Sequence, residues 1–205
     1  MQNRYRVGFI FNFFFTIGKC TTRAFASALI LGPENRMSTM LDTRSSPSIE
    51  PDADAALTTR RDRYRREHDL RAEVDEHARH IVLPIGAEYR AVTMPAELGE
   101  QVRERLAGSG IATPVVEHRR SQRWTFLTRS AGAGSPEPAD SAHLFRMFAT
   151  VASSGSDVVL PSPEDERTGR RTWVERPGER AELPPLRAVV DATLALGRPG
   201  PRRSG

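Results

Sequence analysis

The sequence lacks several features that would point to a function class directly. It has one cysteine, Cys20, so the chain cannot form an internal disulfide. It has no uninterrupted apolar run of about 20 residues, the length that a membrane-spanning helix needs. It also has no Gly-x-Ser-x-Gly elbow, no glycine-rich phosphate loop and no dinucleotide-binding fingerprint. Nucleophilic catalysis and nucleotide-cofactor binding therefore gain no support from motifs, and we expect no cofactor.

Lysine and asparagine are confined to the start of the chain. The single lysine, Lys19, and all three asparagines precede Met37, and six of the nine phenylalanines lie in the first 25 residues. From Met37 onward the chain has 25 arginines and 25 acidic residues, so its net charge is zero and the basic pI of 9.9 is no evidence for a nucleic-acid partner. The two regions differ as if their codons had different base compositions. We expect translation to begin at Met37 or Met40, residues 1–36 to be a mis-called start, and the protein to be cytoplasmic.

A secretory signal is the alternative interpretation of residues 1–36. Basic residues precede the apolar stretch VGFIFNFFFTIG, and small residues follow at positions 26–28, as a signal peptide requires. However, Lys19 and Arg23 lie between the apolar stretch and the supposed cleavage site, where charge is disfavoured. The sequence thus favours neither secretion nor a membrane anchor.

The remaining sequence predicts one α+β domain over residues 57–196, with a small mixed sheet packed against two or three helices. Residues 37–56 are rich in Ser, Pro and Asp and are expected to form a flexible leader, and residues 197–205 a disordered tail. Helices are predicted over 57–68, over 95–110, over 141–151 with Leu144, Phe145, Phe148 and Val151, and over LPPLRAVVDATLAL. Strands are predicted for HIVLP and RAVTMP as a hairpin or paired strands, for 114–117 and 124–128 around the turn HRRSQR, for DVVLPSP and for TGRRTWVERP.

Three of these segments together resemble a known family. The succession AVTMPAELGEQVRERL, PVVEHRRSQRWTFLTR and DVVLPSPEDERTGRRTWVERP is similar to short actinobacterial proteins related to the N-terminal domain of bifunctional DNA primase/polymerases. The resemblance covers roughly residues 64–196 and rests on core residues rather than on chemistry. Some of these short proteins carry the name of a DNA-directed RNA polymerase beta subunit, although this chain is far too short to be a complete one.

The resemblance implies a two-metal site in an active member of the family. Clustered carboxylates would hold magnesium or manganese ions that orient a nucleoside triphosphate. The only Asp-x-Asp in this chain is formed by Asp52 and Asp54, inside the expected flexible leader, which cannot hold such a site rigidly. No catalytic residue can be carried over, so we expect a non-catalytic relative.

Two arginine-rich turns are the best candidates for a binding site. Arg119, Arg120 and Arg123 precede Trp124, and Arg170 with Arg171 precede Trp173. Arginines beside an exposed aromatic ring are typical of phosphate contacts combined with base stacking. The alternative is that Trp124 fills the core while the arginines solvate a hairpin turn. The nucleic-acid hypothesis gains weight if the two turns converge in space.

A metal site is the weaker candidate. Glu73, His77 and His80 are spaced to share one face of a helix, which would align them as ligands. The region is densely charged, however, and His80 is expected to begin a strand, which would break the alignment. A solvated charged surface is the default interpretation, and we expect no metal.

Three function classes follow. The leading hypothesis is a nucleic-acid-associated accessory or binding protein that contacts phosphates of DNA or RNA through the arginines named above. The second is a protein-interaction module that contacts a partner protein through the apolar C-terminal helix. The third, a divergent nucleotidyltransferase, needs a carboxylate cluster that the spacing of acidic residues does not reveal.

Overall fold

The computed structural model describes residues 53–130, 136–180 and 182–197, and these ranges form an α+β domain, as the sequence predicts. The helices are α1 (Ala53–His68), α2 (Ala96–Gly108), α3 (Pro138–Arg146), α4 (Pro163–Thr168) and α5 (Leu186–Gly197). The strands are β1 (Glu73–Asp75), β2 (His80–Pro84), β3 (Tyr89–Pro95), β4 (Val115–His118), β5 (Arg123–Arg129), β6 (Thr150–Val151), β7 (Asp157–Leu160) and β8 (Arg171–Glu175). A 3-10 turn, η1 (Arg119–Ser121), connects β4 to β5.

The strands form two sheets rather than the single mixed sheet that was expected. One sheet has the order β1-β2-β7 and the other the order β6-β3-β5-β4-β8, and all neighbouring strands are antiparallel. The predicted pairing of HIVLP with RAVTMP is wrong, because these segments are β2 and β3 and belong to different sheets. Ile81 of β2 pairs with Leu160 of β7 instead. Buried residues point to both faces of β2, which suits the middle of the smaller sheet.

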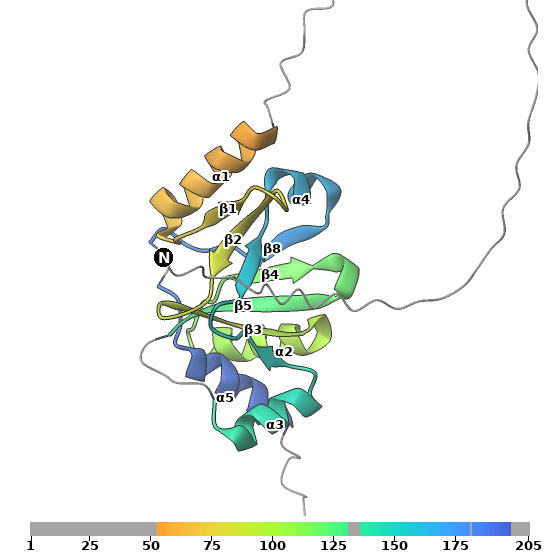
Figure 1. Cartoon of the computed structure of the whole chain (residues 1–205). Coiled ribbons are helices and arrows are strands. Elements are labelled where there is room, and N and C mark those ends of the chain that lie inside the picture. The colour runs from red at the N-terminus through yellow and green to blue at the C-terminus, as the bar shows by residue number, and fades with distance from the viewer. Residues whose placement is uncertain (1–52, 131–135, 181, 198–205) are drawn as a thin grey trace, which may run out of the picture. The chain divides into compact units, whose positions relative to one another are not determined.

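The larger sheet separates two apolar cores, and Figure 1 shows the elements on either side of it. Helices α2, α3 and α5 cover one of its faces, while the smaller sheet lies on the other with α1 and α4. Because side chains alternate along a strand, Ala91 of β3 enters one core and Val92 the other. Phe126 and Leu127 of β5 divide in the same way. The domain therefore has three layers, with the larger sheet in the middle.

Helix α2 forms where the sequence predicts it. Pro95 precedes its first turn, and Gly110 follows its end with φ of 74°, a backbone conformation that suits glycine. Val102 and Leu106 are buried in the core on the helix side. Gly99 is buried as well, because the side chain of Trp124 packs closely against it.

Helix α5 also forms as predicted, but its apolar side chains are buried inside the domain. Leu186, Val189, Val190 and Leu194 pack in the core between the larger sheet and α2. The hypothesis that this helix offers an apolar face to a partner protein is therefore wrong for those side chains. The sequence could not distinguish the two outcomes, since an apolar stripe serves either purpose.

Two predicted boundaries are also corrected. Helix α1 begins at Ala53, so Asp54 lies in its first turn, where it pairs with Arg79 at 2.9 Å, and not in a flexible leader. Helix α3 ends at Arg146, so Phe148 lies beyond it and Val151 belongs to β6. Residues 1–36, residues 37–52 of the predicted leader with Asp52 among them, and residues 198–205 of the predicted tail lie outside the described residues. No helix in the described ranges is long and apolar enough to cross a membrane.

Candidate functional site

The turn between β4 and β5 presents two arginines to solvent. The hairpin closes through η1, and Gln122 follows it in the left-handed region with φ of 51°. The carbonyl of Gln122 accepts a hydrogen bond from the backbone N–H of Ala96 at 2.9 Å, which fixes the turn against the start of α2. Arg119 and Arg120 are both exposed on this anchored turn.

The second arginine-rich segment directly follows the short helix α4. The side chain of Ser162 accepts a hydrogen bond from the backbone N–H of Asp165, while Asp165 accepts one from the N–H of Ser162, so a capping box begins α4. The helix ends at Gly169, whose φ is 65°. Arg170 then lies exposed in the link to β8.

The two segments converge because β8 pairs with β4. His118 lies opposite Arg171 and Glu117 lies opposite Thr172 in the antiparallel register. As a result, Nη1 of Arg119 is 3.3 Å from the position that a Cβ on Gly169 would occupy. The sequence separates these residues by 50 positions, and the sheet brings them into contact. We call the exposed set Arg119, Arg120 and Arg170 the arginine edge.

Most of the positive charge of the arginine edge is uncompensated. Within the described ranges, no carboxylate lies within 4.0 Å of the guanidinium of Arg120 or Arg170. Arg119 has only a long contact with Glu117, at 3.7 Å. Since the chain from Met37 onward has no net charge, this local excess is a property of the fold.

Arg171 and Arg123 have mainly structural partners. Nη1 of Arg171 donates to Oδ1 of Asp165 at 2.8 Å, and both side chains are largely buried. Nη2 of Arg123 donates to the carbonyl oxygens of Thr93, at 3.2 Å, and Phe148, at 2.7 Å. Burial lowers the pKa of Arg123, which has no carboxylate partner in the part of the chain that the structure describes.

Trp124 faces the helix side of the larger sheet, opposite to His118 and Arg123. Its ring packs under Gly99 of α2, where the ring atom Cε3 lies 2.9 Å from the position of a Cβ. Its Nε1 is buried and has no hydrogen-bond partner among the described residues. The core role that the sequence also allowed is the observed one, and this ring is not placed beside the arginine edge for stacking. Trp173 is likewise partly buried, in the other core.

A polar cluster lies on the other face of the larger sheet, next to the arginine edge. His118 Nε2 is 3.0 Å from Oγ1 of Thr125, which is 2.9 Å from Oγ1 of Thr93. Burial lowers the pKa of His118 to about 4, the charges of Arg171 and Arg123 also lower it, and Asp165 acts in the opposite direction. At neutral pH the imidazole is therefore uncharged and adds nothing to the positive potential.

The structure does not bring the three candidate metal ligands together on a helix. Glu73 opens β1, His77 lies in the turn that follows, and His80 opens β2, as expected for the last of them. Glu73 pairs with Val82 rather than with His80 in the hairpin. Among the residues that the structure describes, no group of three or more His, Cys, Asp or Glu side chains could hold a metal ion.

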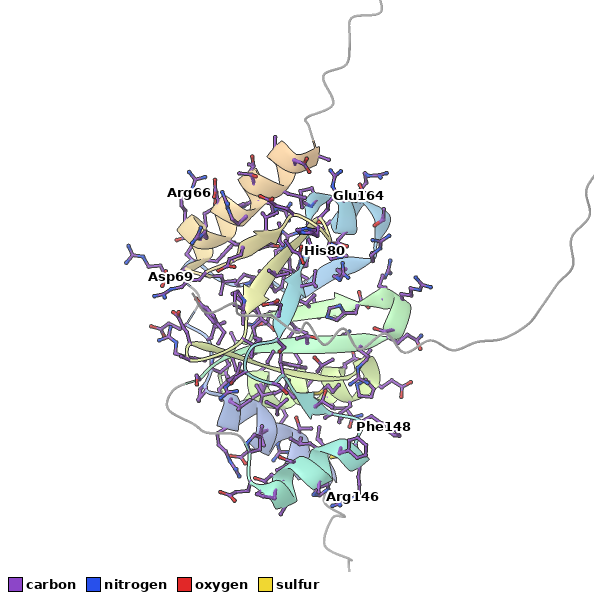
Figure 2. The ribbon with its side chains drawn as sticks, in the orientation of Figure 1. Arg66, Asp69, His80, Arg146, Phe148 and Glu164 are labelled. Atoms are coloured by element: carbon purple, nitrogen blue, oxygen red, sulfur yellow. The ribbon has the colours of Figure 1, made fainter. Side chains whose placement is uncertain are left out.

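A cavity of about 760 Å³ lies between α1, the turn before β2 and α4. Small apolar side chains, among them Ala56 and Ala78, line part of its wall, and Arg79, His80 and Arg170 contribute basic groups. Arg170 thus lines the cavity and also belongs to the arginine edge. Figure 2 shows His80 in this region, close to Glu164 of α4.

Two exposed phenylalanines were missed at the level of sequence. Phe145 in α3 and Phe148 after it are 73% and 72% exposed, although their spacing indicates burial on one helical face. No signal in the sequence indicates this exposure, because FRMFAT has no glycine or proline to mark the end of the helix before Phe148. Comparisons of the chain with protein-family models, with curated proteins and with solved structures gave no match.

Proposed function

We propose that the protein binds nucleic acid by contacting phosphates with the arginine edge. The observation that carries this proposal is the convergence of the two arginine-rich turns, in which Arg119 reaches Gly169 and Arg170 lies at the same end of the β4–β8 pair. The resemblance to the N-terminal domain of primase/polymerases supports the same function class, and we propose an accessory role rather than a catalytic one.

Guanidinium chemistry favours a phosphate ligand. Arginine offers a planar set of N–H donors that matches phosphate oxygens, and it keeps its charge at all accessible pH values. Within the described ranges, Arg120 and Arg170 have no carboxylate within 4.0 Å that would compete with such a ligand. Phosphate contacts position a nucleic acid without reading its sequence, so we expect binding with little sequence preference.

The decisive measurement is the salt dependence of oligonucleotide binding. Each phosphate contact releases counterions, so the affinity should fall steeply as the salt concentration rises. Replacing Arg119 and Arg120 by alanine should weaken binding and reduce the magnitude of the log–log salt slope by about 1.4 on a single strand, since each contact contributes about 0.7.

A matched control is available on α1. Arg65 and Arg66 are also adjacent and exposed, and their replacement by alanine removes the same charge at a different surface. Figure 2 places Arg66 on the opposite side of the view from Glu164 of α4. We expect this control variant to bind like the wild type. Binding that is absent, independent of salt, or weakened equally by both double variants would overturn the proposal.

The alternative function, nucleotidyl transfer, has a separate readout. A divergent nucleotidyltransferase would incorporate nucleotides on a primed template in the presence of manganese. Incorporation that the Arg119→Ala/Arg120→Ala variant reduces would replace the accessory role by a catalytic one. Binding without incorporation under the same conditions would support the accessory role.

A further inference from the structure

The end of α3 presents two aromatic rings to solvent. Phe145 and Phe148 are 73% and 72% exposed, whereas the remaining phenylalanine of the described ranges, Phe126, is fully buried. Large aromatic side chains are usually found in the core, since each buries a large apolar area. Two such rings exposed within four positions of each other therefore form a candidate contact surface.

Phe148 is held in an unfavourable backbone conformation. Its φ is 56°, in the left-handed region where helices usually place a glycine after their last turn. A bulky residue in this region is a genuine outlier, and such outliers gather at functional sites. The backbone N–H of Phe148 donates to the carbonyl of Phe145, and the N–H of Ala149 donates to that of Leu144, both at 2.9 Å. These hydrogen bonds hold the backbone of Phe148 in place while its ring stays exposed.

The side chain of Arg123 connects Phe148 to the arginine edge. Its Nη2 donates to the Phe148 carbonyl at 2.7 Å, and Arg123 directly follows the turn that carries Arg119 and Arg120. In Figure 2, Phe148 and Arg146 lie on the same side of the view as Glu164 of α4. Phe148 and the turn that carries Arg119 and Arg120 therefore lie at the same end of the larger sheet, whereas Phe145 lines a hollow with Arg90, near the other end of β3.

We infer that Phe148 stacks on a base of single-stranded nucleic acid whose phosphates contact the arginine edge. This inference rests on the proposed function and narrows its ligand to a strand with unpaired bases. In a duplex the base faces are covered by their neighbours, so an aromatic platform contributes only to single-strand binding. Phe148 thereby takes the stacking role that the sequence suggested for Trp124.

Charge favours this ligand over a second copy of the chain. Arg146 is exposed in the last turn of α3 and has no carboxylate within 4.0 Å among the described residues, and Arg123 carries an uncompensated charge beside Phe148. A symmetric dimer through the phenylalanines would bring these arginines close to their own copies, which costs free energy. A ligand with negative charges and aromatic faces complements both features.

The experiment compares variants at position 148 on two probes, an oligothymidylate of about 16 nucleotides and a duplex of the same length. Phe148→Gly should weaken single-strand binding about 5- to 150-fold, the effect of losing one stacked base. It should leave duplex binding within about twofold of the wild type. Phe148→Tyr should keep the single-strand affinity, whereas Phe148→Leu, which is apolar but not aromatic, should lose it.

Folding does not confound this test. Glycine accommodates positive φ without strain, so Phe148→Gly should unfold at a temperature equal to or above that of the wild type. Equal single-strand affinities for the wild type and Phe148→Gly would overturn the inference, while a loss in Arg119→Ala/Arg120→Ala alone would leave the proposed function in place. A dimer that Phe148→Gly converts to a monomer, with binding of both probes unchanged, would overturn the inference in favour of self-association.

Discussion

Trp173 donates a hydrogen bond from its indole Nε1 to the phenol oxygen of Tyr64 at 2.9 Å, across 109 positions of sequence. The Tyr64 hydroxyl in turn donates to the carbonyl of Pro161 at 2.7 Å. The two rings also meet edge to face, with centroids 5.9 Å apart. These contacts join α1 to β8 and to the link between β7 and α4, and Arg170 of the arginine edge lies between α4 and β8.

Removing the Tyr64 hydroxyl should destabilise the fold. Tyr64→Phe leaves the indole N–H of Trp173 and the carbonyl of Pro161 without partners, and we expect a loss of about 1–3 kcal/mol in the free energy of unfolding. Urea denaturation measures it. The double variant Tyr64→Phe/Trp173→Phe should lose less than the sum of the single variants, because it removes both polar partners. Additive losses would show that the hydrogen bond contributes nothing.

Acidification should destabilise the protein through His118. Its imidazole titrates near 6.5 when unfolded and at about 4 when folded, so between these values the unfolded chain binds more protons. The free energy of unfolding should therefore fall as the pH drops from about 6.5 to 4, by up to about 3 kcal/mol from this group. In His118→Gln this part of the pH dependence should vanish. An NMR titration that placed the folded imidazole near 6.5 would contradict the prediction.

The ion pair of Asp165 with Arg171 should matter far more than its exposed neighbour. Asp165 is 3% exposed and also caps α4, so Asp165→Asn leaves a largely buried guanidinium unpaired and should cost about 3 kcal/mol. Glu164→Gln breaks the exposed pair with Arg167 and should cost less than about 1 kcal/mol. Chemical denaturation of both variants tests this difference, and equal losses in the free energy of unfolding would contradict the prediction.

Adding a methyl group to α2 should have opposite effects at its two glycines. A Cβ at Gly99 would lie 2.9 Å from the Trp124 ring, so Gly99→Ala should destabilise the fold by about 1–3 kcal/mol. A Cβ at Gly108 would meet none of the described residues within 4 Å, so Gly108→Ala should stabilise the fold by up to about 1 kcal/mol. Thermal unfolding of both variants tests this prediction. An unfolding temperature that Gly99→Ala leaves unchanged would show that the Trp124 ring does not lie against Gly99.

The elements predicted correctly are those with local signals. Pro95 and Gly110 bound α2, and a polar turn separates β4 from β5, so short stretches of sequence were sufficient. The partner of β2 was wrong because Ile81 and Leu160 are distant in sequence, and no local pattern encodes their pairing. Because that pairing was not predicted, the division of the strands into two sheets was not predicted either.

The candidate site was predictable in its residue types but not in its geometry. The sequence identified Arg119, Arg120 and Arg170, yet their contact depends on the pairing of β4 with β8. The direction of Trp124 was ambiguous because β5 is a central strand with apolar residues on both faces. The exposure of Phe148 depends on a left-handed backbone that a phenylalanine does not signal.

The order of the strands along the chain also decides when the smaller sheet can be completed during synthesis. Translation delivers β1 and β2 early, but β7, the third strand of their sheet, only at residues 157–160. Until then β2 keeps an open edge beside apolar side chains such as Ile81 and Leu83, an arrangement that templates aggregation. We therefore expect a chain truncated before residue 157 to aggregate more readily than the finished domain, whatever the stability of that domain.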